Sequence, residues 1–322
     1  MTDLMTADLA GRLGRAGLDP AAAGRLVLAA LAEDLAGGAD VTSRAIIAGG
    51  TRGRADLVAR TAGVVAGLPV AEAAFQAAGP VTFPAGLPGS AAAACPVGTL
   101  ARAADGDRVA AGQVLLTVEG PLEAILTAER TALNLLCHLS GVATLTRAWV
   151  DAVAGTGARI RDTRKTLPGL RAVQKYAVRC GGGVNHRMSL ADAALIKDNH
   201  VAAAGSVTAA YAAVMQNAGG LPVEVECDTL AQVAEAVAAG AELVLLDNFA
   251  VPDMTRAVAM VAGQARLEAS GGLTLARARE VAQTGVDYLA VGALTHSAPA
   301  LDIGLDLISA RHQDGSGDAA DD

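Results

Sequence analysis

Aromatic side chains are scarce in this chain, making up only 2% of its 322 residues, although 52% of the residues are hydrophobic. A core of the expected size must therefore be built mainly from Ala, Val, Leu and Ile. The chain is also acidic, with a formal net charge of -8 and a pI of about 5.1. Few aromatics and an acidic balance argue against a surface for nucleic acids.

Cysteine is sparse as well, and its four positions (Cys95, Cys137, Cys180 and Cys227) form no Cys-x-x-Cys pair. This spacing predicts free thiols in a reducing cytoplasm rather than disulfides or a zinc site. The sequence has no apolar run long enough to cross a membrane, and no signal peptide is recognisable at its start. No G-x-G-x-x-G follows a predicted strand, and no Ser/His/Asp constellation can be argued. We therefore expect a cytoplasmic protein that does not bind membranes.

Positive charge is concentrated in residues 161–200, where eight Lys and Arg side chains stand against three Asp. A cationic segment in an acidic protein indicates an anionic ligand. For Arg171, Lys175 and Arg179, which recur every four residues, a solvated helix face is the preferred interpretation. Four of the other cations end predicted strands or follow the triple glycine Gly181–Gly183, so we expect them to converge. They are Arg164, Lys165, Arg187 and Lys197.

The hydrophobic pattern changes along the chain. Its first 120 residues mix helical and strand patterns, with a helix predicted over 20–35, and a long helix is predicted over 121–153. Strands are then predicted at 158–164, 184–187, 193–198, 222–227, 243–248, 265–270 and 288–292. Helical segments separate the later strands, which predicts parallel strands with right-handed crossovers closing into a (β/α) barrel.

Polar residues follow several of these strands, at the end where barrel enzymes carry their active sites. The first three strand ends are basic, and the next two carry Glu226 and Asp247. Arginine binds carboxylates bidentately, and carboxylate oxygens suit Mg²⁺ that is also held by phosphates. An ion pair with the basic side chains is the simpler explanation of Glu226 and Asp247. The turns Ser270–Gly272 and Gly292–Leu294 offer backbone N–H groups for a phosphate, although tight-turn geometry alone would also explain them.

The motifs DTRKTLPGLR, KYAVRCGGGVNHRMSLADAALIKDNH, EVECDTL, LLDNF, EASGGLTL and DYLAVGALTHSAPALDIGLDL resemble the quinolinate phosphoribosyltransferase family, also called nicotinate-nucleotide pyrophosphorylase (carboxylating). The resemblance extends from about Leu28 to Leu307. With it, we predict an α/β protein whose N-terminal α+β sandwich-like domain precedes an irregular (β/α) barrel. The predicted ranges are 1–132, joined by the segment 298–312, for the first domain, 133–297 for the barrel, and 313–322 for a disordered tail.

The resemblance implies phosphoribosyl transfer to quinolinate with loss of carbon dioxide, supported by Mg²⁺ that enters with phosphoribosyl pyrophosphate. It implies a homodimer with shared sites, or a higher oligomer, in which Arg130 serves the partner's site. Lys165, Glu226 and Asp247 would act on the phosphoribosyl donor. Residues implied to bind the substrates are Arg130, Thr163, Arg164, Lys165, His186, Arg187, Lys197, Glu226, Asp247, Ser270, Gly271, Gly272, Gly292 and Ala293.

Two other functions fit the same residues. Lys197 or Lys165 at a strand end is also typical of a Schiff-base lyase, although the flanking arginines disfavour it. A non-catalytic sensor of a phosphorylated ligand could use the same fold. The acidic pair favours catalysis, because a sensor has less need of Mg²⁺ ligands.

Overall fold

A computed structural model describes residues 5–78 and 97–312. The chain divides into two compact units, one of residues 1–141 and 299–322 and the other of residues 142–298, so that the division falls within one long helix. The prediction placed the same division at residues 132/133. The disordered tail predicted for 313–322 lies outside the described residues.

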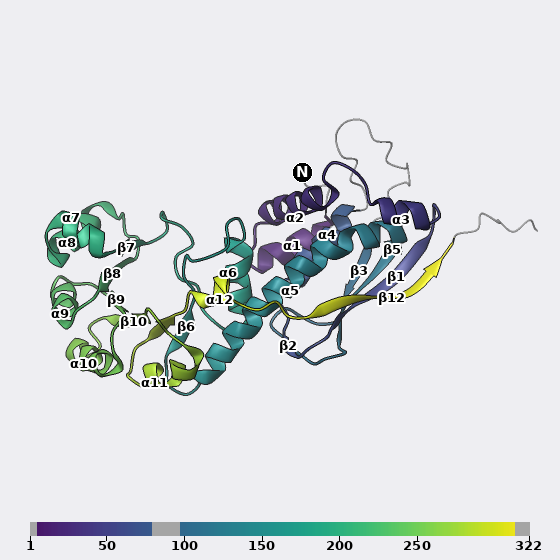
Figure 1. Cartoon of the computed structure of the whole chain (residues 1–322). Coiled ribbons are helices and arrows are strands. Elements are labelled where there is room, and N and C mark those ends of the chain that lie inside the picture. Colours follow the sequence, from purple (N-terminus) through teal and green to yellow (C-terminus); the bar gives the residue numbers. More distant parts are fainter. Residues whose placement is uncertain (1–4, 79–96, 313–322) are drawn as a thin grey trace, which may run out of the picture. The chain divides into compact units, whose positions relative to one another are not determined.

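The first unit contains an antiparallel sheet of four strands in the order β12-β1-β5-β3, and a small pair of β2 with β4 (Figure 1). Its helices are α1 (Ala7–Arg15), α2 (Pro20–Leu35), α3 (Val41–Ile46), α4 (Leu68–Ala78) and α5 (Leu122–Ala152), of which α5 ends in the second unit. Its strands are β1 (Arg52–Ala59), β2 (Gly63–Val64), β3 (Gly98–Ala101), β4 (Arg108–Val109), β5 (Val114–Pro121) and β12 (Ile303–Arg311).

Local signals explain where these helices begin and end. Asp19 caps α2 by accepting the N–H of Ala21, and Pro20 occupies the first turn, where its missing N–H costs nothing. Ala36 and Gly37 then end the helix in left-handed conformations. Helices α1 and α2 pack on α4 around an apolar core. One buried carboxylate, that of Glu72 on α4, is bound by Arg12 and by Thr99.

The second unit is a curved parallel sheet in the order β6-β11-β10-β9-β8-β7 with helices outside it (Figure 1). The strands are β6 (Arg159–Arg161), β7 (Ala194–Ile196), β8 (Val223–Cys227), β9 (Leu243–Asp247), β10 (Arg266–Ser270) and β11 (Tyr288–Ala290). The helices are α6 (Arg171–Cys180), α7 (Asp198–Ala204), α8 (Val207–Asn217), α9 (Leu230–Ala238), α10 (Val251–Val261), the short 3₁₀ helix η2 (Leu275–Arg277), α11 (Ala278–Ala282) and α12 (Ala293–His296). An antiparallel first unit and a parallel second unit confirm the predicted fold class.

One strand prediction is wrong. Residues 184–187 form only a single bridge, between Val184 and Arg161, and not a strand. The reason is that the N–H of His186 donates to the Asp162 side chain instead of to a neighbouring strand. Arg187 donates through NH1 to the carbonyl of Ala193 at 3.0 Å, so this segment approaches β7 through a side chain. The ring of strands is therefore completed irregularly.

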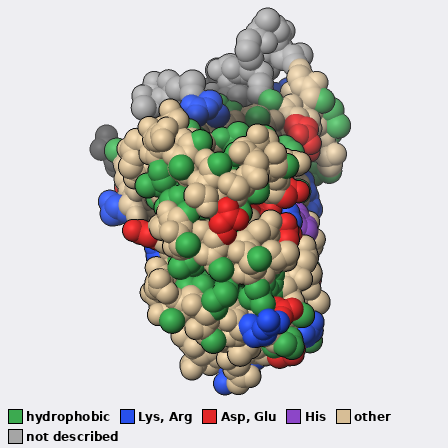
Figure 2. Space-filling view, turned by 90° about the vertical axis from the view of Figure 1, so that its left-hand side faces the viewer, with side chains coloured by type: hydrophobic (Ala, Val, Ile, Leu, Met, Phe, Trp, Pro, Cys, Tyr) green, Lys and Arg blue, Asp and Glu red, His purple; other side chains and the backbone are tan. Residues whose placement is uncertain are grey.

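Charged side chains do not gather on the face seen in Figure 2, where they are scattered among hydrophobic and uncharged ones. No helix in the described part of the chain is both long and apolar enough to cross a membrane.

Candidate active site

A cavity of about 430 Å³ opens at the carboxyl ends of the parallel strands, and every residue lining it belongs to the second unit. Its walls are Thr163, Arg164, Lys165, His186, Arg187, Leu195, Lys197, Glu226, Leu245, Asp247, Glu268, Ser270 and Ala290. Nine of the residues proposed from the sequence thus surround one cavity, because parallel strands deliver their last side chains to the same edge of the sheet.

The basic side of the cavity is formed by Arg164, Lys165, Arg187 and Lys197. Burial and the neighbouring charge of Arg164 lower the pKa of Arg187 from its usual value. Arg164 Nε is buried and has no hydrogen-bond partner among the described residues. The repulsion between Arg164 and Arg187 and the unpaired Nε of Arg164 favour an anion in the cavity.

The acidic side contains Glu226 and Asp247. Lys197 Nζ lies 2.5 Å from Glu226 Oε2, which is the ion pair that the simpler explanation predicted. Asp247 accepts a hydrogen bond of 2.7 Å from Asn248 Nδ2, and Asn248 has a positive φ of 55°. Gly271 must remain glycine here, because a Cβ would lie 2.1 Å from Asn248 Oδ1. The turn after β10 is therefore packed directly against the Asp247–Asn248 turn.

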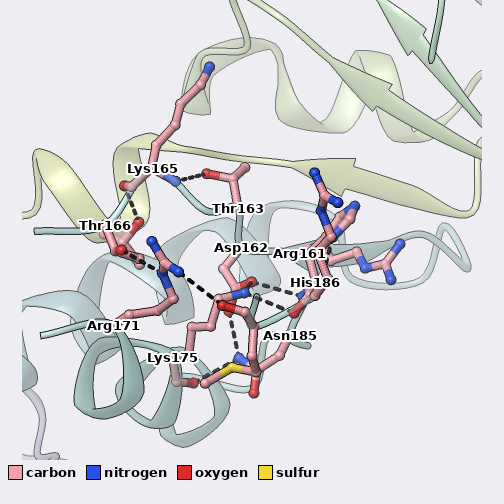
Figure 3. Close-up of polar contacts among 12 residues, drawn as sticks. Arg161, Asp162, Thr163, Lys165, Thr166, Arg171, Lys175, Asn185 and His186 are labelled. Carbon is pink, nitrogen blue, oxygen red and sulfur yellow. Dashed lines mark hydrogen bonds and ion pairs between the residues drawn. The ribbon is translucent and has the colours of Figure 1, made fainter. Parts of the chain in front are cut away.

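A buried polar network supports the basic side of the cavity (Figure 3). Asp162, which is fully buried, accepts hydrogen bonds from Lys175 Nζ, Asn185 Nδ2 and the N–H of His186. Lys175 Nζ also donates to the carbonyl of His186 at 2.8 Å. Burial raises the pKa of Asp162 and lowers that of Lys175, while the attraction between the two opposes both changes. The network holds the segment after β6 against residues 184–187, where a strand was predicted.

Lys175 corrects the sequence interpretation of α6 as a solvated basic face, because its side chain is fully buried. Arg171 donates to Thr166 Oγ1 and to the carbonyl of Met188, and Arg179 donates to Asn185 Oδ1. The four-residue spacing is real, but the face it marks points partly into the unit. The helical spacing of basic residues does not show whether a buried acid, here Asp162, lies opposite one of them.

A second charged layer lies one step deeper in the barrel. Glu224 and Glu268 precede Glu226 and Ser270 by two residues, so they share the inward face of β8 and β10. His186 Nε2 lies 2.6 Å from Glu224 Oε2, and Arg161 NH1 lies 2.6 Å from Glu268 Oε2. Burial and then the charge of Glu224 raise the pKa of Glu268 to about 7, against the opposing effect of Arg161.

The sequence reasoning missed Glu268, although it lines the cavity. The signal was available, since Glu268 lies two residues before Ser270 on the same strand face. The predicted residues Arg130, Gly271, Gly272, Gly292 and Ala293 do not line the cavity. Arg130 lies on α5 within the first unit. Gly292 stays close to the site, because a Cβ there would come within 3.1 Å of Lys165 Cδ.

Comparison with known proteins gives one consistent match. The family model "Quinolinate phosphoribosyl transferase, N-terminal domain" matches residues 40–140, and the corresponding C-terminal domain model matches residues 142–306. Nicotinate-nucleotide pyrophosphorylase [carboxylating] of Mycobacterium leprae is 54% identical over 281 residues, covering 86% of this chain and 94% of that protein. A probable nicotinate-nucleotide pyrophosphorylase [carboxylating] of Synechocystis is 42% identical, covering 80% and 83%.

Solved structures agree with these matches. The nicotinate-nucleotide pyrophosphorylase from Francisella tularensis superposes with a TM-score of 0.81 at 36% identity, covering 89% of this chain and 96% of that one. NadC from Streptococcus pyogenes gives a TM-score of 0.79 at 37% identity with the same coverage.

Proposed function

This chain belongs to the quinolinate phosphoribosyltransferase family, and we propose that it transfers the phosphoribosyl group of phosphoribosyl pyrophosphate to quinolinate with decarboxylation. The products are nicotinate mononucleotide, pyrophosphate and carbon dioxide, in NAD biosynthesis. The observation that carries the proposal is one cavity with a basic and an acidic side, lined by Arg164, Arg187, Lys197, Glu226 and Asp247. The relatives do not favour a Schiff-base lyase or a non-catalytic sensor.

In the proposed mechanism, Arg164, Arg187 and Lys197 hold the two carboxylates of quinolinate, with His186 beside them. The ring nitrogen attacks the anomeric carbon as the bond to pyrophosphate breaks. The carboxylates of Glu226 and Asp247 stabilise the positive charge that develops on the ribose. Holding both reactants in line supplies a large part of the rate enhancement. After transfer, the cationic ring accepts the electron pair left by carbon dioxide, and a proton replaces the carboxylate.

Mg²⁺ fits this cavity, because Glu226 and Asp247 offer the hard oxygen atoms that it prefers. When bound with the phosphoribosyl donor, it would neutralise the charge of the departing pyrophosphate. Lys165, on the basic side of the cavity, would also contact the phosphoribosyl donor. The turns at 270–272 and 292–293 would bind the 5′-phosphate through their backbone N–H groups, with Thr163 close to Gly292. We also propose a cytoplasmic location, since Cys137 and Cys227 are thiols rather than disulfides.

A direct assay tests the function. The purified protein is mixed with quinolinate, phosphoribosyl pyrophosphate and Mg²⁺, and nicotinate mononucleotide, pyrophosphate and carbon dioxide are measured. All three should form in equal amounts. Nicotinate in place of quinolinate leaves cavity cations without a carboxylate, so we expect kcat/KM to fall by a factor on the order of 10²–10⁴. Comparable turnover of the two acids would contradict the assignment of Arg164, Arg187 and Lys197.

We propose further that the enzyme is a homodimer in which Arg130 enters the partner's site. Arg130→Ala and Arg187→Ala should each be nearly inactive alone. In a mixed dimer, one site keeps both arginines and the other lacks both. Random equal mixing makes about half of the dimers mixed, so about a quarter of the unmodified activity should return. If subunits are shown to exchange and no activity returns, Arg130 does not act in the partner's site.

A further inference from the structure

The inward face of the barrel is charged in a place where barrels usually carry branched apolar side chains. Glu224 and Glu268 are both buried within it, at 2% and 0% exposure. Neither is explained by the proposed mechanism, which uses the residues one step closer to the cavity mouth. Glu268 nevertheless lines the same cavity as the substrate-binding cations.

The two carboxylates are incompletely satisfied. Glu268 Oε2 accepts from Arg161, but Glu268 Oε1 lies 3.7 Å from His186 Nε2, which is too far for a hydrogen bond. Glu224 Oε1 and Glu268 Oε1 are buried and have no hydrogen-bond partner among the described residues. A buried carboxylate oxygen without a donor costs free energy that a proton would recover.

The ring of His186 identifies what can occupy this space. The N–H of Arg187 donates to His186 Nδ1 at 2.7 Å, so Nδ1 carries no proton. The neutral ring therefore carries its proton on Nε2 and donates it to Glu224. His186, Glu224 and Glu268 have atoms within 4.8 Å of one another, as metal ligands do. A metal ion would need the lone pair of Nε2, so the geometry favours a proton.

The charged groups around the two carboxylates come from several elements of the barrel. Arg161 donates to Glu268, and the charge of Arg187 also acts on Glu224, so two cations face the two carboxylates. The groups facing Glu268 are Arg161 from β6, His186 from the 184–187 segment and Glu224 from β8, while Leu245 from β9 and Ala290 from β11 are apolar. An added proton would therefore answer the missing donor at Glu268 Oε1, not an imbalance of formal charge.

We propose that Glu268 takes up a proton from solvent on Oε1 when quinolinate binds, and that this makes the affinity for quinolinate depend on pH. The inference rests on the proposed function. Two carboxylates entering a cavity that Glu268 lines repel its negative charge, and the proton removes the repulsion. Oε1–H then faces the carboxylate of Glu224. The product has one carboxylate fewer, so the proton returns to solvent when the product leaves.

The pKa of Glu268, already raised to about 7, supports this coupling, because a further rise then falls in the neutral range. At pH 8 about a tenth of the free sites carry the proton, and a rise of one unit on binding would protonate about half. With a rise of one unit, quinolinate affinity should therefore fall as pH rises above 7, by about threefold per pH unit at most and about tenfold in total.

Calorimetry tests the proposal on the full-length protein. Quinolinate is titrated at pH 8 in buffers of different ionisation enthalpy, which gives the number of protons taken up per site. We expect about 0.4 or more for the unmodified protein and near zero for Glu268→Gln. Glu280→Gln, which alters an exposed carboxylate paired with Arg277, serves as the control and should leave the uptake unchanged. Equal uptake in the unmodified protein and Glu268→Gln would overturn the proposal.

A second measurement uses the unmodified protein and so does not depend on the folding of a variant. Infrared difference spectra of the isotope-labelled, unmodified protein should gain a protonated carboxyl band when unlabelled quinolinate is added. Absence of this band, with binding confirmed by heat, would also overturn the proposal. If quinolinate gives no binding heat at all, the proposed function fails instead, so the two failures can be distinguished.

Discussion

Glu72 in the first unit and Glu268 in the second are equally buried, at 1% and 0% exposure, but they are bound differently. Arg12 donates to both oxygens of Glu72, at 2.7 and 2.6 Å, and Thr99 adds a third hydrogen bond. Glu268 has a partner on Oε2 alone. Burial of a charge therefore does not by itself indicate function. The informative difference is the oxygen for which the fold supplies no donor.

The Asp162–Lys175 pair is the satisfied case within the second unit, and Lys175→Met would leave Asp162 buried without its cation. We expect the free energy of unfolding to fall by about 3–5 kcal/mol, since removing one partner of a buried pair leaves the charge of the other buried and unpaired. Urea unfolding monitors the change. Adding Asp162→Asn should recover part of the loss, and a change below about 1 kcal/mol in the single variant would count against the network.

Glu268→Gln should change how the free energy of unfolding depends on pH. The pKa of Glu268 is raised from 4.5 to about 7, so the folded protein holds a proton that the unfolded chain releases earlier. That contribution to stability is complete below pH 4.5 and is lost as pH rises through 7. Gln does not titrate, so the variant should gain about 3 kcal/mol relative to the unmodified protein over this range. Parallel stability curves from denaturant titrations at several pH values would contradict the raised pKa.

Arg12→Ala would convert Glu72 from a satisfied carboxylate into one bound only by Thr99. We expect a loss of about 1.5–3 kcal/mol in the free energy of unfolding, the usual cost of hydrogen bonds to a charged group. kcat/KM should stay unchanged, because neither Glu72 nor Arg12 lines the cavity. Arg12→Lys keeps the charge and should restore part of the stability. A drop in kcat/KM without a change in folding would show that Glu72 also affects the active site, contrary to the distinction drawn between the two glutamates.

The smallest effect is expected at the surface, where Arg60, the residue after β1, donates two hydrogen bonds to Asp306 on β12. Both side chains are well exposed, and solvent screening leaves such pairs with little net effect. Arg60→Ala should leave the thermal unfolding midpoint indistinguishable from that of the unmodified protein. A clear decrease would show that good geometry matters more than burial in this protein.

The sequence predicted most of the second unit because its period is regular. Glu226, Asp247 and Ser270 recur at similar intervals, and parallel crossovers bring such positions to one edge. The prediction failed at residues 184–187, where a side chain, Asp162, takes the place of a neighbouring strand. Local pattern cannot show that substitution, because the partner lies more than twenty residues earlier in the chain.

The same limit explains the misjudged and missed residues. Lys175 has the spacing of a surface cation, and only the packed structure shows Asp162 opposite it. Glu268 lies in the motif EASGGLTL, but only Ser270 was predicted as a site residue, because Ser270 ends the strand. Which of two inward residues lies at the mouth and which in the layer below depends on barrel geometry, not on residue type.

The pairing of β12 with β1 has a consequence for biosynthesis. β1 ends at residue 59 and β12 begins at residue 303, so one edge of the first sheet stays uncovered while about 240 further residues are made. At roughly 5–20 residues per second, that interval lasts about ten seconds to a minute on the ribosome. The unit whose synthesis starts first is thus the last to be completed, and until then a nascent strand edge is exposed to any chaperone or neighbouring chain that can pair with it.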